Sequence, residues 1–280
     1  MTLSILGSIL LSTPQEGSLD VLDGETLYEG GWLFTTGYGF EKREELVDHT
    51  LTLGAHYGLR YDLQLSAIVP YVRRTLTLDD PTGPDRVSSE GMGDAAIIAK
   101  WRVYRWDDVG KALNFAVLAG LELPTGSDGE RDRGSALPPE LQPGSGSWDP
   151  SLGTAVTYEP GRWRFNAAML YQRNRKEGDE FFSELAVGNR FWLEPYPGPF
   201  LRFDALLRYR HQNRSSHGGQ AIDDLLGSDG DLLTTGATLA FRPRPTLDFQ
   251  IFVEVPLYQR ISDLQMEEGP SFFFAFGFRI

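Results

Sequence analysis

Polar and apolar residues alternate with a period of two along most of the chain, which is the pattern of β-strands whose two faces meet different surroundings. In residues 47–57 (VDHTLTLGAHY) one face carries Val, His, Leu, Leu, Ala and Tyr, and the other carries Asp, Thr, Thr, Gly and His. Residues 163–173 and 201–211 repeat this alternation. The pattern predicts an all-β fold of about twelve strands, an even number as bacterial membrane barrels require. The predicted strands are residues 26–41, 47–58, 61–77, 93–106, 112–125, 149–159, 162–175, 180–194, 199–213, 231–243, 246–260 and 270–280.

The connections between the predicted strands alternate between short turns and longer polar loops. The short turns fall at residues 58–61, 107–110, 159–162, 194–199 and 242–245, and the longer connections are residues 79–90, 125–147, 213–230 and 262–269. This asymmetry is typical of outer-membrane barrels, with turns in the periplasm and long loops outside the cell. With a periplasmic N-terminus, every long loop lies outside and Ile280 ends in the periplasm.

Strand length, aromatic placement and the last strand favour a membrane barrel over a soluble β-sandwich. The alternating runs extend over about 11 to 15 residues, whereas soluble strands average about 5 to 6 and membrane strands need about 9 to 11. Aromatic residues lie near strand ends, where girdles at the two membrane interfaces would place them: Tyr28, Trp32, Tyr38, Tyr57, Tyr71, Trp101, Tyr158, Trp163, Tyr171 and Trp192. The last strand puts Phe272, Phe274, Phe276, Phe278 and Ile280 on one face.

That last strand resembles the C-terminal signal that the barrel-assembly machinery reads, with Ile280 in place of the usual terminal Phe. Together these features predict a closed antiparallel up-and-down transmembrane β-barrel in the bacterial outer membrane. We expect outer-membrane lipid, lipopolysaccharide and the barrel-assembly machinery as its partners.

The composition excludes several other classes of protein. The chain has 280 residues and no cysteine, so it has neither a disulfide framework nor a thiolate metal site. Its net charge of −13 and pI near 4.8 argue against a nucleic-acid partner, which needs a basic surface. No run approaches the roughly 18 apolar residues of a membrane-spanning helix.

The N-terminus carries a short apolar run at residues 3–11 (LSILGSILL), followed by Ser, Thr and Pro. This run resembles the apolar part of a secretory signal, although no Lys or Arg precedes it. We therefore expect residues 1–24 to be a signal-peptide remnant or a flexible N-terminal segment, and residues 25–280 to form the barrel. The alternative is a short ordered N-terminal segment.

Charged side chains within the predicted strands fall on the face opposite to lipid. An Arg or Lys that faces the middle of the bilayer would cost roughly 2–4 kcal/mol, so these residues are expected to line the interior. The predicted channel-lining residues are Lys100, Arg102, Glu122, Arg164, Glu184, Arg190, Arg202, Asp204, Arg208, Arg210 and Glu254. They form either a selective pore lining or an ion-pair network that plugs a narrow lumen. As a pore lining, Arg164, Arg190, Arg202, Arg208 and Arg210 would form a basic wall that disfavours cations.

Four short motifs resemble one known family in their order and spacing. They are LQLSAIVPY at residues 63–71, GMGDAAIIAKW at 91–101, LELPTG at 121–126 and GSWDPSLGTAVTY at 146–158. Over roughly residues 25–280, the chain is similar to the outer-membrane transporter family named for the meta-cleavage pathway of phenol degradation. The resemblance implies a β-barrel in the outer membrane with a part in the passage of aromatic or other apolar compounds. It brings no catalytic residue with it.

Other chemistry is weakly represented in the sequence. His56 points inward close to Ser66 on the next predicted strand, but polar neighbours of this kind are common, and a nucleophile needs a base within hydrogen-bond reach. His211 and His217 lie near the aspartates of residues 223–224, but this spacing is not diagnostic of a metal site and a solvated loop is simpler. The sequence therefore predicts no enzyme activity, no cofactor and no metal.

These observations predict passive, substrate-selective passage of small molecules, aromatic or apolar ones among them, across the outer membrane. The main alternative is a structural or adhesive barrel without transport. An outer-membrane hydrolase is the third possibility.

Overall fold

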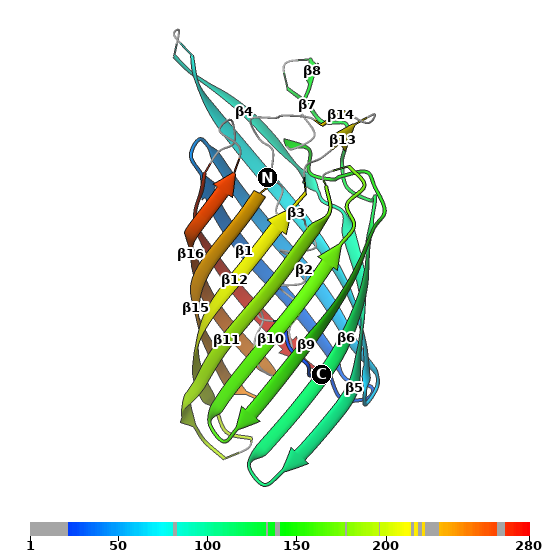
Figure 1. The fold of residues 1–280 in the computed structure, drawn as a ribbon, viewed down its shortest axis with the longest axis vertical. Helices are drawn as coiled ribbons and strands as arrows, with labels where there is room; N and C mark the ends of the chain where they lie inside the picture. The colour runs from blue at the N-terminus through cyan, green and yellow to red at the C-terminus, as the bar shows by residue number, and fades with distance from the viewer. Residues whose placement is uncertain are drawn as a thin grey trace.

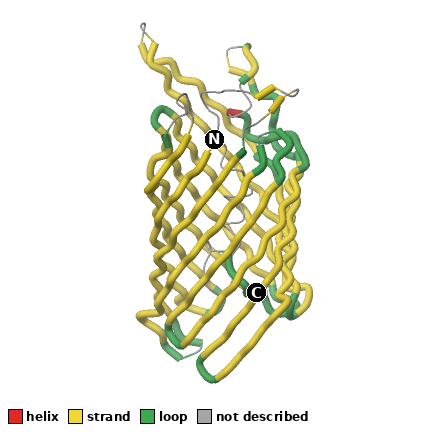
Figure 2. The backbone as a smooth tube through the Cα atoms, viewed as in Figure 1, coloured by secondary structure: helices red, strands yellow, loops and turns green. Residues whose placement is uncertain are grey.

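The protein forms one closed barrel of twelve long strands (Figures 1 and 2). The computed structural model describes residues 22–80, 83–132, 134–137, 141–176, 178–195, 197–213, 216–217, 220–221, 230–261 and 267–280. The barrel strands are β1 (Trp32–Arg43), β2 (Leu46–Arg60), β3 (Leu63–Asp80), β5 (Ala95–Asp108), β6 (Lys111–Leu123), β9 (Asp149–Pro160), β10 (Trp163–Gln172), β11 (Glu180–Leu193), β12 (Phe200–Gln212), β15 (Gly230–Arg244), β16 (Leu247–Ile261) and β17 (Glu268–Arg279). At the end with the long loops lie β4 (Gly83–Met92), β7 (Arg131–Asp132), β8 (Ser135–Ala136), β13 (Ser216–His217) and β14 (Gln220–Ala221).

Each barrel strand pairs antiparallel with its neighbours, and the first strand pairs with the last. β1 joins β17 on one side and β2 on the other, and β2 continues to β3. The described wall therefore closes on itself, which pairs the main-chain groups as a sheet in lipid requires. The predicted all-β, closed, up-and-down barrel of about twelve strands is confirmed. Among the described residues, no helix is long and apolar enough to cross a membrane.

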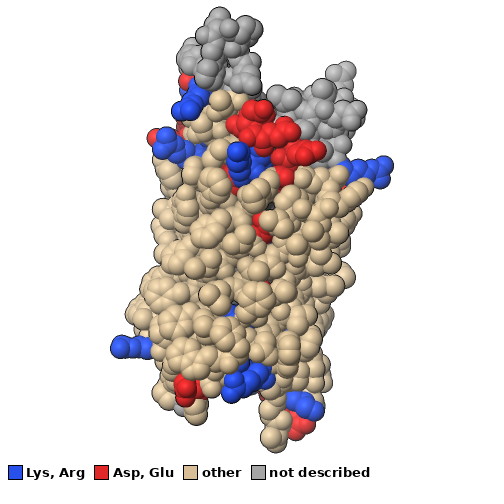
Figure 3. Space-filling view, turned by 90° about the vertical axis from the view of Figure 1, so that its left-hand side faces the viewer, with Lys and Arg blue, Asp and Glu red and all other residues tan. Residues whose placement is uncertain are grey.

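On the face shown in Figure 3, charged side chains gather towards the two ends of the barrel, and large hydrophobic side chains are exposed along the strands between them. On β17, Phe272, Phe274 and Phe278 are exposed, whereas Ala275 and Arg279, of the opposite parity, are buried. Exposed aromatic side chains gather towards the two ends of the strands, as membrane girdles do. Tyr38, Tyr71, Trp148 and Tyr171 lie towards the loop end, and Trp32, Trp101, Trp163 and Trp192 lie towards the turn end.

Replacing Phe274 by arginine (Phe274→Arg) is expected to impair folding into a bilayer, because this side chain points outward near the middle of β17. An arginine facing lipid at the midplane costs roughly 2–4 kcal/mol. Ser271→Ala changes the inner face of the same strand and should leave stability unchanged. Urea titration of both variants, refolded into lipid vesicles, measures the difference. Equal stability of the two would contradict the assignment of the faces.

The first strand begins later than the predicted residue 26. β1 starts at Trp32, and Leu22–Leu27 lies inside the barrel with every residue buried. The chain turns at Gly30, whose φ of 78° lies in the left-handed region that favours glycine. Two consecutive glycines, Gly30 and Gly31, make this turn possible, and the alternation rule does not detect it. Of the predicted N-terminal segment, residues 1–21 lie outside the described residues.

The first predicted long loop, residues 79–90, belongs instead to a hairpin. β3 continues to Asp80 and pairs with β4 along its whole length, so the hairpin rises above the barrel rim (Figure 1). One face of the hairpin is covered, because Leu76 and Val87 pack with Leu137 and Leu141 of the loop at residues 125–147. The short run of polar residues and prolines between 79 and 90 hid this pairing from the alternation rule. The predicted loops at residues 213–230 and 262–269 lie largely outside the described residues.

Candidate functional site

The inward charged side chains gather at two levels of the lumen. The level at the turn end, which we expect to face the periplasm, is called the periplasmic level, and the level at the loop end is called the outer level. The periplasmic level contains Lys100, Glu159, Arg164, Arg190, Arg202 and Asp204, and the outer level contains Arg43, Asp48, Arg74, Glu184, Arg208 and Glu254. All these residues come from the parity opposite to the lipid face, so one alternation provides both surfaces.

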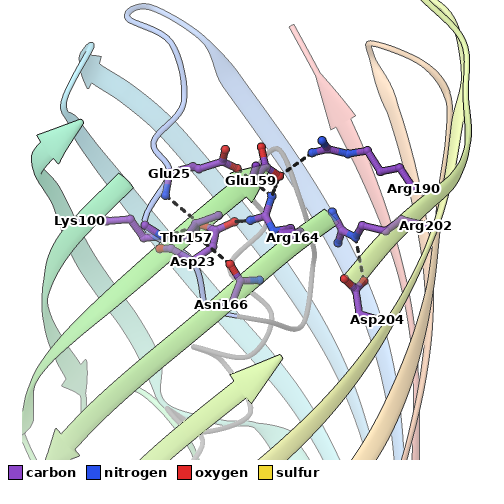
Figure 4. Close-up of polar contacts among 11 residues, drawn as sticks. Asp23, Glu25, Lys100, Thr157, Glu159, Arg164, Asn166, Arg190, Arg202 and Asp204 are labelled. Atoms are coloured by element: carbon purple, nitrogen blue, oxygen red, sulfur yellow. Dashed lines mark hydrogen bonds and ion pairs between the residues drawn. The ribbon is translucent and has the colours of Figure 1, made fainter. Parts of the chain in front are cut away.

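The periplasmic level is occupied by Leu22–Leu27, which we call the plug segment (Figure 4). The carboxylate of Asp23 lies 2.6 Å from Nη2 of Arg164 and 3.2 Å from Nζ of Lys100. Glu25 lies 3.1 Å from Nη1 of the same Arg164. Nζ of Lys100 also donates to the main-chain oxygen of Asp23 at 3.0 Å. The segment is therefore held by ion pairs to strands on one side of the barrel wall.

Main-chain contacts fix the plug segment as closely as its charges do. The N–H of Gly24 donates to Oγ1 of Thr157 at 2.9 Å, and the N–H of Leu27 donates to Oε1 of Gln64 at 3.0 Å. A Cβ at Gly24 would lie 2.6 Å from the main-chain oxygen of Asn114, so glycine alone fits this close approach. These contacts make the docked position specific to this short sequence.

The plug segment balances the charge of the wall around it. The wall supplies four cationic side chains, Lys100, Arg164, Arg190 and Arg202, and two carboxylates, Glu159 and Asp204. Asp23 and Glu25 add the two further carboxylates that make positive and negative groups equal in number. The docked segment thus offsets the two excess positive charges of this set of side chains, beside which Arg242 and Arg279 share Asp248 at the same end of the inner wall.

Both carboxyl groups of the plug segment are ionised at pH 7. Burial raises the pKa of Asp23 to about 6, although Lys100 and Arg164 act in the opposite direction. Burial also opposes ionisation of Glu25, but the guanidinium groups of Arg164 and Arg190 outweigh it and lower its pKa below the usual range. Burial therefore destabilises the charge of Asp23 slightly more than its two ion pairs stabilise it, whereas Glu25 is firmly held as an anion.

Apolar side chains form two clusters on the inner wall, which we together call the apolar belt: Ile68, Ile98, Leu118, Leu170 and Phe182 in one, and Leu206 and Phe252 in the other. Leu22 of the plug segment packs into the same cluster as Ile68 and Leu118. The plug segment therefore reaches from the charged periplasmic level to the belt. A solute that crosses the barrel must pass this apolar surface.

The outer level is an ion-pair network beside a small cavity. Nε of Arg208 donates to Glu184 at 2.5 Å and its Nη1 donates to Glu254 at 2.7 Å. The guanidinium of Arg208 also lies 4.5 Å from the ring centre of Phe252, within cation–π range. The cavity has a volume of about 60 Å³ and is lined by Arg208 and Glu254 together with Arg210, Glu268 and Phe182. The side chains of the wall therefore leave part of the lumen unfilled at the outer level.

The loop at residues 125–147 folds into the outer mouth of the barrel. Asp94 is fully buried and accepts the main-chain N–H of Gly126 at 2.7 Å and that of Ser145 at 2.5 Å. Further along, Leu141 packs with Leu46 near the outer end of β2. The aspartate of the motif GMGD thus holds both ends of the loop, and the loop covers part of the mouth.

His56 and Ser66 meet as their predicted positions suggested. Nδ1 of His56 and Oγ of Ser66 share a hydrogen bond of 2.8 Å, and Nε2 of His56 lies 3.3 Å from Oγ1 of Thr35. Gln64 donates to the same Ser66 oxygen at 3.2 Å and also accepts from the plug segment at Leu27. Among the described residues no carboxylate hydrogen-bonds to His56, and its side chain is fully buried. The pair therefore belongs to the hydrogen-bond chain that supports the plug segment.

The family of the chain follows from a match to residues 34–266, which covers most of the barrel. The matching family is described as "Putative MetA-pathway of phenol degradation". The chain belongs to this family. The plug segment of this phenol-degradation family member lies just before the matched residues. The predicted resemblance is confirmed.

Solved structures support the same fold for this phenol-degradation family member. It is similar to a COG4313 outer membrane channel from Pseudomonas putida F1, with a TM-score of 0.68 and 16% identity over 94% of this chain and 100% of that one. It is also similar to the NanC porin, with a TM-score of 0.51 and 8% identity over 88% of this chain and 100% of that one. No curated protein matches the sequence. At these identities the likeness shows the fold, which is that of an outer-membrane barrel.

The predicted lining residues of this family member all lie on the inward parity, divided between two levels. Lys100, Arg102, Arg164, Arg190, Arg202 and Asp204 belong to the periplasmic half, and Glu122, Glu184, Arg208, Arg210 and Glu254 belong to the outer half. Arg102 lies at the rim and donates to the main-chain oxygen of Tyr61. Glu122 accepts a hydrogen bond of 3.1 Å from Gln172. Of the predicted metal-binding loop, residues 223–224 lie outside the described residues.

The predicted basic wall is wrong as a free positive surface, because each of its arginines has a carboxylate partner. Arg164 and Arg190 share Glu159 at 2.9 and 2.6 Å, and Arg202 pairs with Asp204 at 2.8 Å. Towards the outer end, Arg208 and Arg210 pair with acidic residues of β11, β16 and β17. The arrangement combines both predicted possibilities, an ion-pair network and a lining, in one lumen.

Sequence reasoning missed the residues that complete these pairs. They are Asp23 and Glu25 of the plug segment, Glu159 at a predicted turn, and Glu268 at the start of β17. One signal pointed to them. The predicted lining of the periplasmic half held five cationic residues against Asp204 alone, and buried cations need partners.

Proposed function

We propose that this protein is a passive channel for small solutes in the bacterial outer membrane, closed at its periplasmic end by the plug segment and opened when that segment leaves the lumen. One observation carries the proposal. The barrel wall does not fill its own interior, because Leu22–Leu27 fits inside it with every residue buried. Without the segment, the periplasmic level has room for an extended chain, and therefore for small organic molecules.

The bonds that hold the plug segment favour a reversible closure. Besides the packing of Leu22, its contacts are ion pairs and hydrogen bonds that water can replace outside the lumen. Burial raises the pKa of Asp23, so docking this carboxylate is nearly balanced between the loss of its hydration and the gain of its ion pairs. A closure of this kind is released at moderate cost.

The apolar belt favours the passage of solutes that have an apolar part. Ile68, Leu118, Phe182 and Phe252 are buried on the inner wall, where a polar solute would lose hydrogen bonds to water without replacement. An aromatic or aliphatic body would instead lose little there. The description of the family, which names phenol degradation, agrees with aromatic compounds as one such class.

A structural or adhesive barrel without transport is the competing function. Such a barrel would be stable with a lumen filled by its own wall, as small barrels are. A lumen filled instead by a separable segment, with a further cavity of about 60 Å³ at the outer level, supports the channel.

Gly24→Ala tests the channel directly. The added Cβ would lie 2.6 Å from a main-chain oxygen of β6, so the segment must leave its position, and conductance should rise. Planar-bilayer recording of the purified protein should show rare openings for wild type and frequent openings for the variant. Gly129→Ala is the matched control, because a Cβ there meets nothing within 4 Å. Folding of each protein is checked by its heat-dependent migration in detergent gels. Folded proteins that never conduct would refute the proposed function.

A further inference from the structure

We infer that the periplasmic level of the lumen binds the carboxylate group of a small solute, at the place that Asp23 and Glu25 occupy while the plug segment is docked. This inference rests on the proposed channel function and names its solute class: organic acids with one or two carboxylates and an apolar body.

The charge of the open lumen is the first argument. When the plug segment leaves, Lys100, Arg164, Arg190 and Arg202 remain, with Glu159 and Asp204 as the wall carboxylates. Two positive charges are then in excess in this set, in which Lys100, Arg164 and Arg202 are buried. A buried charge without a partner is costly. An anion that enters the level removes that cost, whereas a cation increases it.

Arg202 provides an independent argument, because it is incompletely bonded even while the plug segment is docked. Its side chain is fully buried, and its Nε donates to Asp204 at 2.8 Å. Neither terminal nitrogen, Nη1 nor Nη2, hydrogen-bonds to any of the described residues. Figure 4 shows the Arg202 guanidinium extending from β12 towards Arg164. Its two free donors form the planar fork that matches a carboxylate.

The docked plug segment shows how a carboxylate is held at this level. One carboxylate, that of Asp23, contacts Arg164 and Lys100 from two strands at once. A second, that of Glu25, contacts Arg164 on its other terminal nitrogen. The plug segment therefore occupies the site as a solute with two carboxylates would, and it competes with such a solute for the same donors.

The position of the site explains why the solute also has an apolar body. Leu22, next to Asp23 in the chain, packs on Ile68, Ile98 and Leu118 of the apolar belt. A carboxylate held by Arg164 would therefore carry its remaining atoms towards the belt, where burial of apolar surface is favourable. Aromatic carboxylates combine both features.

The test is isothermal titration calorimetry on the detergent-solubilised, full-length Glu25→Lys protein, in which the reversed charge expels the plug segment. Benzoate and benzyl alcohol serve as probes, because they share the ring and differ in charge. Benzoate should bind at least about tenfold more tightly than benzyl alcohol, the effect of one charge-assisted hydrogen bond. Wild type should bind benzoate more weakly than the variant, since its own carboxylates occupy the site. Equal affinity for the two probes would overturn the inference.

A second pair of variants separates the site from general charge. Arg202→Gln with Asp204→Asn, added to Glu25→Lys, removes a neutral ion pair and leaves the net charge unchanged. Benzoate affinity should fall at least about tenfold and benzyl alcohol affinity should not change. Arg60→Gln with Asp62→Asn is the control, because it removes a pair of the same spacing at the turn between β2 and β3, where the arginine is exposed. An unchanged benzoate affinity after loss of Arg202 would also overturn the inference. Binding needs no conductance, so a protein that binds benzoate but never conducts would refute only the proposed channel.

Discussion

Replacing Glu25 by lysine (Glu25→Lys) should raise the open fraction of the channel by at least about a hundredfold. Glu25 lies 3.1 Å from Arg164, and Arg190 and Arg202 also act on it. A lysine there replaces attraction by repulsion inside a buried level. Loss of one partner of a buried ion pair costs about 3–5 kcal/mol, and 1.4 kcal/mol corresponds to about a tenfold change in population. The docked state is therefore strongly disfavoured.

Single-channel recording in planar bilayers measures this change as open time. Glu29→Lys is the matched control, because Glu29 follows the plug segment and is exposed, so the same change of charge should leave the openings as in wild type. Urea titration shows whether the barrel itself is intact, since the segment contributes no strand to the wall. If both variants had wild-type open times, the plug segment would not be the closure.

The wall of the barrel could be predicted from the sequence because lipid imposes one rule on every strand. Side chains on one parity must be apolar, so Phe272 and Phe274 and their counterparts on other strands reveal the outward face without any knowledge of neighbours. The inward parity then follows, and with it the position of Lys100, Arg164 and Arg208. Strand pairing between sequence neighbours fixes the order of the sheet.

The plug segment could not be predicted by the same rule, because its residues contact the inner wall of the barrel and not lipid. Asp23 and Glu25 are both buried, yet their sequence looks like that of a solvated loop. Their partners, Lys100 and Arg164, are 77 and 141 residues away from Asp23. Only the excess of cations on the periplasmic half indicated that carboxylates were missing, and it did not say where in the chain they would be.

The inward fold of the loop at residues 125–147 was hidden for a related reason. Its glycines and polar residues satisfy the pattern of an exposed loop, and its anchor, Asp94, belongs to a different connection. The motif GMGD was visible in the sequence as a bend at the start of a strand. Its aspartate is buried because it accepts two main-chain N–H groups, and such acceptors are set by the three-dimensional path of the chain.

Asp94→Ala is expected to release this loop from the mouth of the barrel. The substitution removes the acceptor for the N–H groups of Gly126 and Ser145, which lie 2.7 and 2.5 Å from it. An unsatisfied buried donor costs about 1–3 kcal/mol, so the two together disfavour the inward position by about 2–6 kcal/mol. What remains to hold the loop includes the packing of Leu141 and the hydrogen bonds that Arg74, Ser89 and Lys176 donate to its main-chain oxygens. The mouth should therefore open while the wall stays closed.

Trypsin added to intact cells measures the release, because Arg131 lies in the loop and is exposed. Cleavage after Arg131 should be faster in Asp94→Ala than in wild type by at least about thirtyfold, the smallest effect that the loss of about 2 kcal/mol allows. Asp128→Asn is the matched control, since Asp128 lies in the same loop and its side chain is exposed. Equal cleavage rates in the variant and wild type would show that Asp94 does not anchor the loop. Cleavage at Arg162 in place of Arg131 would show that the turn end of the barrel faces outward, because Arg162 lies in the turn between β9 and β10, and the plug segment would then close the channel from outside the cell.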